Sequence, residues 1–259
     1  MSSPNKVRFS LLFLLFSTIF TSTHAQDKAV NQQQQEEATS FYALGVAHHN
    51  SGRYQEAIEA SQQAIRLKPD YASAYAGIGM ASFKLGLFSE AVEALEQAIR
   101  LKPEMYEAHN NLGFLFHRLG QHKKAIEAYR NSIRFAPRLA LAHSNLGNVY
   151  VAEGRYREAI ESLTQAVLLN PEDAIAHCSL GVAYHKKKRY KEAVESYKQA
   201  IRLKPEYAEP HFNLSSAYLK LGDRDAALAR YALLKSLNST LANELYMGIY
   251  KGKILVLKR

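Results

Sequence analysis

One pattern recurs every 34 residues along most of this 259-residue chain and restricts it to an array of similar units. A Leu-Gly pair or a close variant returns at each step, at Leu44-Gly45, Ile78-Gly79, Leu112-Gly113, Leu146-Gly147, Leu180-Gly181 and Leu214-Ser215. Each unit also carries an alanine further on, at Ala57, Ala91, Ala125, Ala159, Ala193 and Ala227. A fixed period of this length indicates stacked supersecondary units, which bury their apolar faces against their neighbours.

Each unit has the pattern of two amphipathic helices joined by a tight turn. In the unit 140–173 a first helical stripe, at i, i+3, i+4 and i+7, holds His143, Leu146, Gly147 and Tyr150. A second stripe holds Tyr156, Ala159, Ile160, Leu163, Ala166, Val167 and Leu169. Gly154 lies between them, where a left-handed residue ends a helix, and Pro171 cannot continue the second one. We expect Gly147 to face Ala159 inside the hairpin.

The turn of the next unit is an exception. Lys188 stands where the other units have glycine. A side chain there opposes a left-handed backbone, so we expect this turn to be the most strained.

These residues and their period resemble the tetratricopeptide repeat (TPR). The resemblance covers six units, at 38–71, 72–105, 106–139, 140–173, 174–207 and 208–241. It implies an all-α fold, an α-solenoid of six helix-turn-helix repeats. In place of the usual tryptophan, the fourth position holds Phe41, Tyr75, His109, His143, His177 and His211, which should fill a slot against the adjacent second helix.

Both ends of the chain depart from the repeat. Residues 1–25, with a basic start, an apolar run of about 12 residues and small residues before position 26, are typical of a secretory signal peptide. The run is shorter than the ~20 residues of a membrane-spanning helix, and a retained anchor is the alternative. Residues 26–37 predict a flexible polar lead. Residues 242–259 predict a capping helix, with Leu234 marking the change, and a basic tail that is either a frayed end or a docking strand.

The charge does not favour a nucleic-acid partner. The net charge is +9, and loss of Lys6 and Arg8 with the signal peptide would lower it to +7. Many cations are expected in the last turns of second helices, where they offset the helix dipole; they include Arg66, Arg100, Arg134 and Arg202. Only Lys186 to Arg189 is a dense basic run. No membrane contact is expected beyond the transient signal peptide.

No pattern for catalysis or a cofactor is present. The single cysteine, Cys178, has no CxxC partner and is expected to pack near the inner surface. The repeated histidines belong to different helices and lack the spacing of metal ligands. The chain lacks hydrolase, phosphate-loop and dinucleotide motifs, so we expect neither an enzyme nor a cofactor.

The resemblance implies that the first helices line a concave surface. The residues it places there as partner-binding are Lys84, Asn110, Asn111, Phe114, Arg118, Asn145, Asn148, Lys186, Asn213 and Lys220. Asn111, Asn145 and Asn213 share one position. The repeats around the first two are similar to those of the O-linked N-acetylglucosamine transferase superhelix, in which an asparagine row holds a peptide backbone. That row is interrupted here by Ala43, Gly77 and Ser179, and the transferase's catalytic domain is absent.

These features together predict a non-enzymatic scaffold or adaptor that binds a peptide or protein segment. Arg118 with Lys84 would favour acidic segments. The layout is similar to that of bacterial periplasmic repeat proteins, so the compartment is expected to be periplasmic or secreted. Two alternatives stay open: a regulatory or targeting subunit of a separately encoded enzyme, and a self-assembling structural element. The sequence leaves the oligomeric state open.

Overall fold

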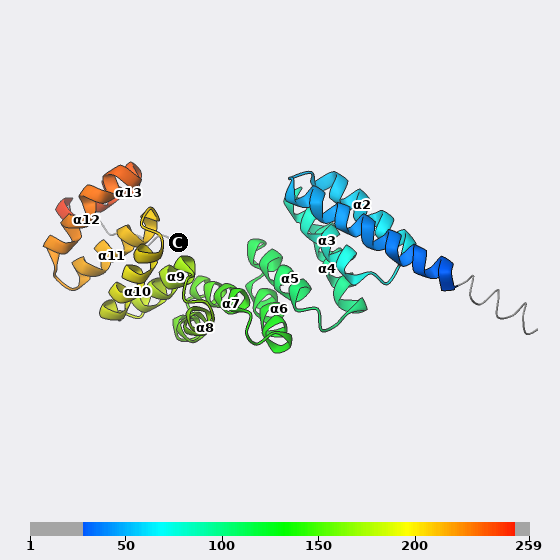
Figure 1. Cartoon of the computed structure of the whole chain (residues 1–259). Helices are drawn as coiled ribbons and strands as arrows, with labels where there is room; N and C mark the ends of the chain where they lie inside the picture. The colour runs from blue at the N-terminus through cyan, green and yellow to red at the C-terminus, as the bar shows by residue number, and fades with distance from the viewer. Residues whose placement is uncertain (1–27, 252–259) are drawn as a thin grey trace, which may run out of the picture. The chain divides into compact units, whose positions relative to one another are not determined.

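The computed structural model describes residues 28–251, and every regular element in that range is an α-helix (Figure 1). The predicted signal peptide and the tail from Gly252 onward lie outside the described residues. A helix over residues 28–50 is followed by α2 (Tyr54–Leu67), α3 (Ala72–Lys84), α4 (Phe88–Leu101), α5 (Tyr106–Arg118), α6 (His122–Phe135), α7 (Ala140–Ala152), α8 (Tyr156–Leu169), α9 (Ala174–Lys186), α10 (Tyr190–Leu203), α11 (Ala208–Lys220), α12 (Arg224–Leu237) and α13 (Ser239–Lys251).

The helices pack as successive hairpins, which confirms the predicted α-solenoid class. Within a hairpin the first helix packs on the second, as α7 does on α8. Inside a compact unit the second helix then contacts the first helix of the next hairpin, as α8 does with α9. The chain divides into two compact units, Met1–Pro103 and Glu104–Arg259. The first unit holds the helices up to α4 and the second those from α5 to α13 (Figure 1).

Close packing inside the first five hairpins depends on the recurring glycine. A Cβ atom at Gly147 would lie 2.5 Å from Leu163 Cγ, and one at Gly113 would lie 2.8 Å from Tyr129 Cδ1. The glycine therefore admits a large side chain of the second helix. For Gly147 the nearest atoms belong to Leu163, one helical turn beyond the expected Ala159.

The turn at Lys188 confirms the expected strain. Lys188 has φ 61° and is the only non-glycine residue with positive φ between residues 28 and 251, whereas Gly154 has φ 72° at the equivalent turn. Both turns make the same hydrogen bonds: the Lys188 N–H donates to the His185 carbonyl at 2.9 Å, as Gly154 does to Val151 at 3.2 Å. A side chain in this conformation costs roughly 1–2 kcal/mol.

The histidines of the fourth position link consecutive repeats. The Nε2 atoms of His143, His177 and His211 lie 2.9, 3.0 and 2.9 Å from the carbonyl oxygens of Pro137, Pro171 and Pro205. Because a carbonyl only accepts, Nε2 carries the proton and donates it. Each of these histidines thus pairs with a carbonyl of the turn that follows the preceding second helix, two residues beyond the end of that helix.

The polar lead differs from its prediction, because residues 28–37 belong to the first helix. Most of their side chains are exposed, so tertiary packing contributes little there. Glutamine, glutamate, lysine and alanine are good helix formers, and Gln32 Nε2 donates to Glu36 Oε1 at 3.0 Å one turn along. The composition that argued against a core is therefore compatible with an exposed helix.

The capping helix is present and begins earlier than the predicted residue 242. α13 starts at Ser239, where Asn238 Oδ1 accepts a hydrogen bond from the Leu241 N–H at 3.0 Å. Leu234 is fully buried in a cluster with Phe212, Leu245 and Ile249. Earlier repeats have alanine or serine at this position. The larger leucine agrees with packing against a helix that is not the first helix of another repeat.

Candidate functional site

The first helices of the second unit bring several predicted binding residues together. Asn110 and Asn111 lie on α5 and Asn145 on α7, and these two helices are in contact. Asn145 Nδ2 donates to Asn110 Oδ1 at 3.2 Å. This bond joins neighbouring repeats across the face that we call the candidate face, which consists of Asn110, Asn111, Phe114, Arg118, Asn145 and Asn148.

Two asparagine side chains of the candidate face differ from the paired Asn110 and Asn145. Asn111 and Asn148 are half-buried, and neither side chain makes a hydrogen bond within the described part of the chain. Phe114 beside them is also half-buried, and Arg118 is exposed at the end of α5. Asn110 is buried, and its amide oxygen accepts the hydrogen bond from Asn145. The face therefore offers amide donors and acceptors next to an aromatic ring.

The third asparagine of the predicted row is not on the surface. Asn213 is fully buried, and its side chain hydrogen-bonds with that of Cys178. We correct its assignment from partner binding to packing. Burial raises the pKa of the Cys178 thiol to about 12, with smaller opposing effects from Tyr207 and Asn213, so the thiol stays protonated near neutral pH.

Two predicted cations lie around a buried histidine. Lys186 and Lys220 are exposed, and both act electrostatically on His185, which is 8% exposed. Burial, followed by these two lysines, lowers the pKa of His185 to about 4. His185 is therefore neutral at pH 7, and the local positive charge comes from the lysines.

Lys84 is exposed at the end of α3 in the first unit, so its joint action with Arg118 stays a prediction.

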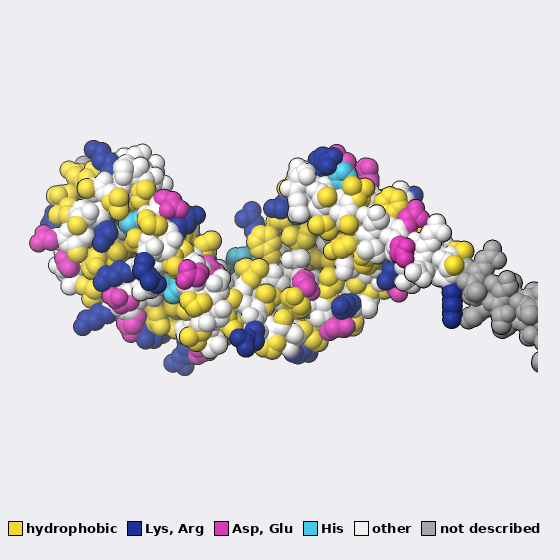
Figure 2. Space-filling view, viewed as in Figure 1, with side chains coloured by type: hydrophobic (Ala, Val, Ile, Leu, Met, Phe, Trp, Pro, Cys, Tyr) yellow, Lys and Arg dark blue, Asp and Glu magenta, His cyan; other side chains and the backbone are white. Residues whose placement is uncertain are grey.

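Charged side chains of both signs are interspersed over the face of each unit that Figure 2 shows. This distribution agrees with the expectation that the cations belong to the last turns of individual helices. In the range 28–251, no group of three or more His, Cys, Asp or Glu side chains is placed to hold a metal ion. No helix among these residues combines the length and apolar character needed to cross a membrane.

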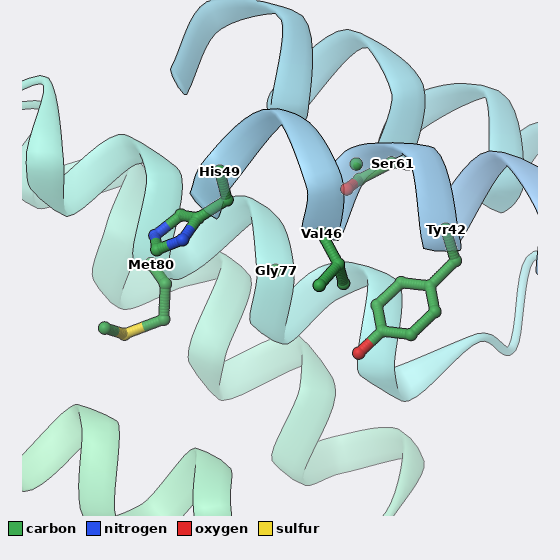
Figure 3. A pocket seen from close by; sticks show the side chains of 7 residues that line it. Tyr42, Val46, His49, Ser61, Gly77 and Met80 are labelled. Carbon is green, nitrogen blue, oxygen red and sulfur yellow. The ribbon is translucent and has the colours of Figure 1, made fainter. Parts of the chain in front are cut away.

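The first unit also contains a hollow that was not predicted from the sequence. A cavity of about 120 Å³ lies between the first helix and α3 and is lined by Tyr42, Gly45, Val46, His49, Ser61, Gly77 and Met80 (Figure 3). One signal could have revealed it. Ser61 occupies the position where other repeats have Leu95, Tyr129, Leu163, Tyr197 and Tyr231.

Comparison with known proteins identifies related folds. A family model described as the cilia and flagella-associated protein 70 C-terminal domain matches residues 72–242, and a TPR repeat model matches residues 49–86. A search of curated proteins gave no match.

Several solved structures share the fold. The PilF structure of Pseudomonas aeruginosa has a TM-score of 0.75 and 18% identity, over 83% of this chain and 98% of that one. PilW, described as a type IV pilus biogenesis factor, has a TM-score of 0.70 and 20% identity, over 79% and 98%. YrrB, described as a TPR protein with an unusual peptide-binding site, has a TM-score of 0.64 and 20% identity, over 73% and 98%. Since the first family model spans more than half of the 259 residues, the chain belongs to the cilia and flagella-associated protein 70 C-terminal domain family of tetratricopeptide repeats.

Proposed function

We propose that this chain is a non-enzymatic scaffold that binds a peptide or protein segment on the candidate face, in an exported compartment. The observation that carries the proposal is the pair of half-buried amides, Asn111 and Asn148, which lack a hydrogen-bond partner among the described residues. A peptide backbone presents N–H and C=O groups in alternation, and an amide side chain can bind both. Phe114 beside them would contact an apolar side chain of the segment.

Charge supports an acidic segment as the partner. Arg118, Lys186 and Lys220 are exposed, and none of them forms an ion pair within residues 28–251. Hydrogen bonds from these cations to carboxylates are stronger than bonds between neutral groups. Binding should therefore weaken as salt is added, because exposed charges are screened.

The likeness to YrrB and PilW supports a binding role and an envelope location at the level of the fold. YrrB is described as having a peptide-binding site and PilW as a pilus biogenesis factor. The signal-peptide pattern of residues 1–25 supports export independently. Mass measurement of the mature protein tests export, because a protein that retains Met1 would contradict it.

The binding test compares two pairs of substitutions. A partner is first recovered by capture from the exported fraction and then titrated against the Asn111→Ala, Asn148→Ala double variant. Loss of each hydrogen bond should reduce affinity by roughly 2- to 13-fold. The control is Glu161→Ala with Gln165→Ala, two exposed positions on α8. If only the control pair weakens binding, the partner uses the second helices and the proposal fails.

A further inference from the structure

The first helices of the last two repeats are buried on more sides than those of the two repeats before them. In α11 every residue of the stretch 210–217 is buried, and in α9 every residue of the stretch 178–183. Eight consecutive residues make more than two helical turns, so α11 has no exposed side over this length. α5 and α7 instead keep one side half-buried, which includes Asn111 and Asn148 of the candidate face.

The neighbouring helices do not account for this difference. Each of α7, α9 and α11 contacts both helices of the preceding repeat, the second helix of its own repeat and the next first helix, whose place after α12 is taken by α13. At the ninth position of the repeat, however, Asn148 on α7 is half-buried, whereas Val182 on α9 and Ser216 on α11 are only 2% and 3% exposed. The extra burial of the inner side of α9 and α11 therefore has another source.

α13 is not that source for α9. Among the helices of the described range, α13 contacts α11 and α12 but not α9. Phe212, the largest side chain on this part of α11, packs in the cluster with Leu245 and Ile249 of α13. The cover of α9 has to come from a segment that continues past α13.

We infer that residues 252–259, which follow α13, bind along the inner side of α11 and α9 as an extended segment. These residues lie outside the described part of the chain, which ends with α13. Ile249, in the last turn of α13, packs in the cluster that contains Phe212, so the segment starts beside α11. Eight extended residues reach ~26 Å, and packed helices lie ~8–10 Å apart, so this segment can cross both α11 and α9.

The composition of the segment suits that surface. It contains a run of four apolar residues, 254–257, two of which are β-branched and favour an extended strand. The inner side of the two helices offers apolar Val182 together with the short side chains of Ser179 and Ser216, which let another backbone approach closely. Burial of the apolar run against this surface removes it from water, which is favourable.

Protection of a thiol in the full chain tests the inference without a partner protein. Ser216→Cys introduces one probe into a chain whose own thiol is removed by Cys178→Ser, and its rate of reaction with a methanethiosulfonate reagent is measured. Asn148→Cys in the same background is the matched reference, because the two positions are equivalent in the repeat and Asn148 is half-buried. Val182→Cys is a second probe of the same face if the Ser216→Cys chain does not fold.

We expect a slow reaction at position 216 and a fast one at position 148. Leu255→Asp with Val256→Asp should raise the rate at position 216 by roughly 10- to 140-fold, the factor that corresponds to the burial of one large apolar side chain. Adjacent residues of an extended segment point to opposite sides, so this pair alters the buried side whichever it is. The melting midpoint of each chain is measured as well, so that general unfolding is not mistaken for local exposure.

The control changes the charge of the same segment and keeps its apolar run. Lys253→Asp with Lys258→Asp should leave the rate at position 216 unchanged, because apolar burial rather than charge holds the segment. Protection should also persist when the protein is diluted, because the segment belongs to the same chain.

Three results would overturn the inference. An unchanged rate in the Leu255→Asp, Val256→Asp chain would show that this segment does not cover the face. An equal rise in the lysine control would show that its apolar residues do not hold it. Loss of protection on dilution would assign the cover to a second copy of the chain. The inference goes beyond the proposed function, and none of these results bears on partner binding by Asn111 and Asn148, so the two can fail separately.

Discussion

The first and fourth repeats share a pattern and differ at one packing position. In the fourth repeat Gly147 faces Leu163, which is fully buried, and the hairpin interior is closed. In the first repeat Gly45 faces Ser61, and a cavity of about 120 Å³ remains. Both glycines allow the helices to approach, so the hairpin forms in either case. The residue opposite the glycine decides whether the space is filled by the repeat itself or remains as a cavity.

The largest effect is expected when the fourth repeat is given the residue of the first. Leu163→Ser should destabilise the protein by about 3–5 kcal/mol, because it removes a fully buried side chain and leaves a cavity. The denaturation midpoint measures the loss. Leu168→Ser is the matched control, since Leu168 lies on the same helix and is 66% exposed. Equal losses for both variants would show that Leu163 is not a core residue.

A bulky residue on the other side of the same contact should cost somewhat less. Gly147→Leu should lower stability by about 3 kcal/mol, at the upper end of the usual cost of overpacking, because its side chain would collide with Leu163. Adding Leu163→Ser in the same chain should recover part of the loss, since serine leaves room for the new leucine. An unchanged melting curve for Gly147→Leu alone would contradict the packing described here.

The fourth and fifth repeats differ in a way that pH can reveal. His185 is buried where the fourth repeat has buried Val151, and its pKa falls from 6.5 to about 4 through burial and then through Lys186 and Lys220. Between these values the unfolded chain takes up a proton that the folded chain does not. Stability should therefore fall as the pH drops from about 6.5 to 4.

His185→Val removes this contribution, so the variant should lose less stability than the native chain over the same window. Urea unfolding at pH 7, 5.5 and 4.5 measures the difference. The pKa of His211 is also lowered, chiefly by burial, so some dependence should remain in both proteins. Identical slopes for the two proteins would rule out His185 as a source.

The smallest effect concerns the turns of the same two repeats. Lys188→Gly should stabilise the protein by about 1 kcal/mol, because glycine adopts positive φ without a Cβ penalty. Gly154→Lys should cost a similar amount in the fourth repeat. Thermal melting of the two variants gives the comparison, and a destabilised Lys188→Gly variant would show that the lysine side chain has a compensating contact.

Much of the fold was predictable because the same sequence pattern occurs in each repeat. The hairpins, the glycine turns, the strain at Lys188 and a cap that follows Leu234 all depend on local pattern. The helix over 28–37 was missed because low hydrophobicity argues against a core without arguing against a solvated helix. The candidate site was predicted less well. The contact between Asn110 and Asn145 and the burial of Asn213 depend on how neighbouring helices pack.

The sequence by itself determined the repeat unit, its period and its family, because each helix needs an apolar stripe and each turn needs a residue that tolerates positive φ. Tertiary structure decided which of the matching positions reach the surface. Asn111, Asn145 and Asn213 share one position in the repeat, yet the first two are half-buried and the last is fully buried. The pocket at Ser61 was decided in the same way, because a missing side chain becomes a cavity only where the surrounding helices do not close over it.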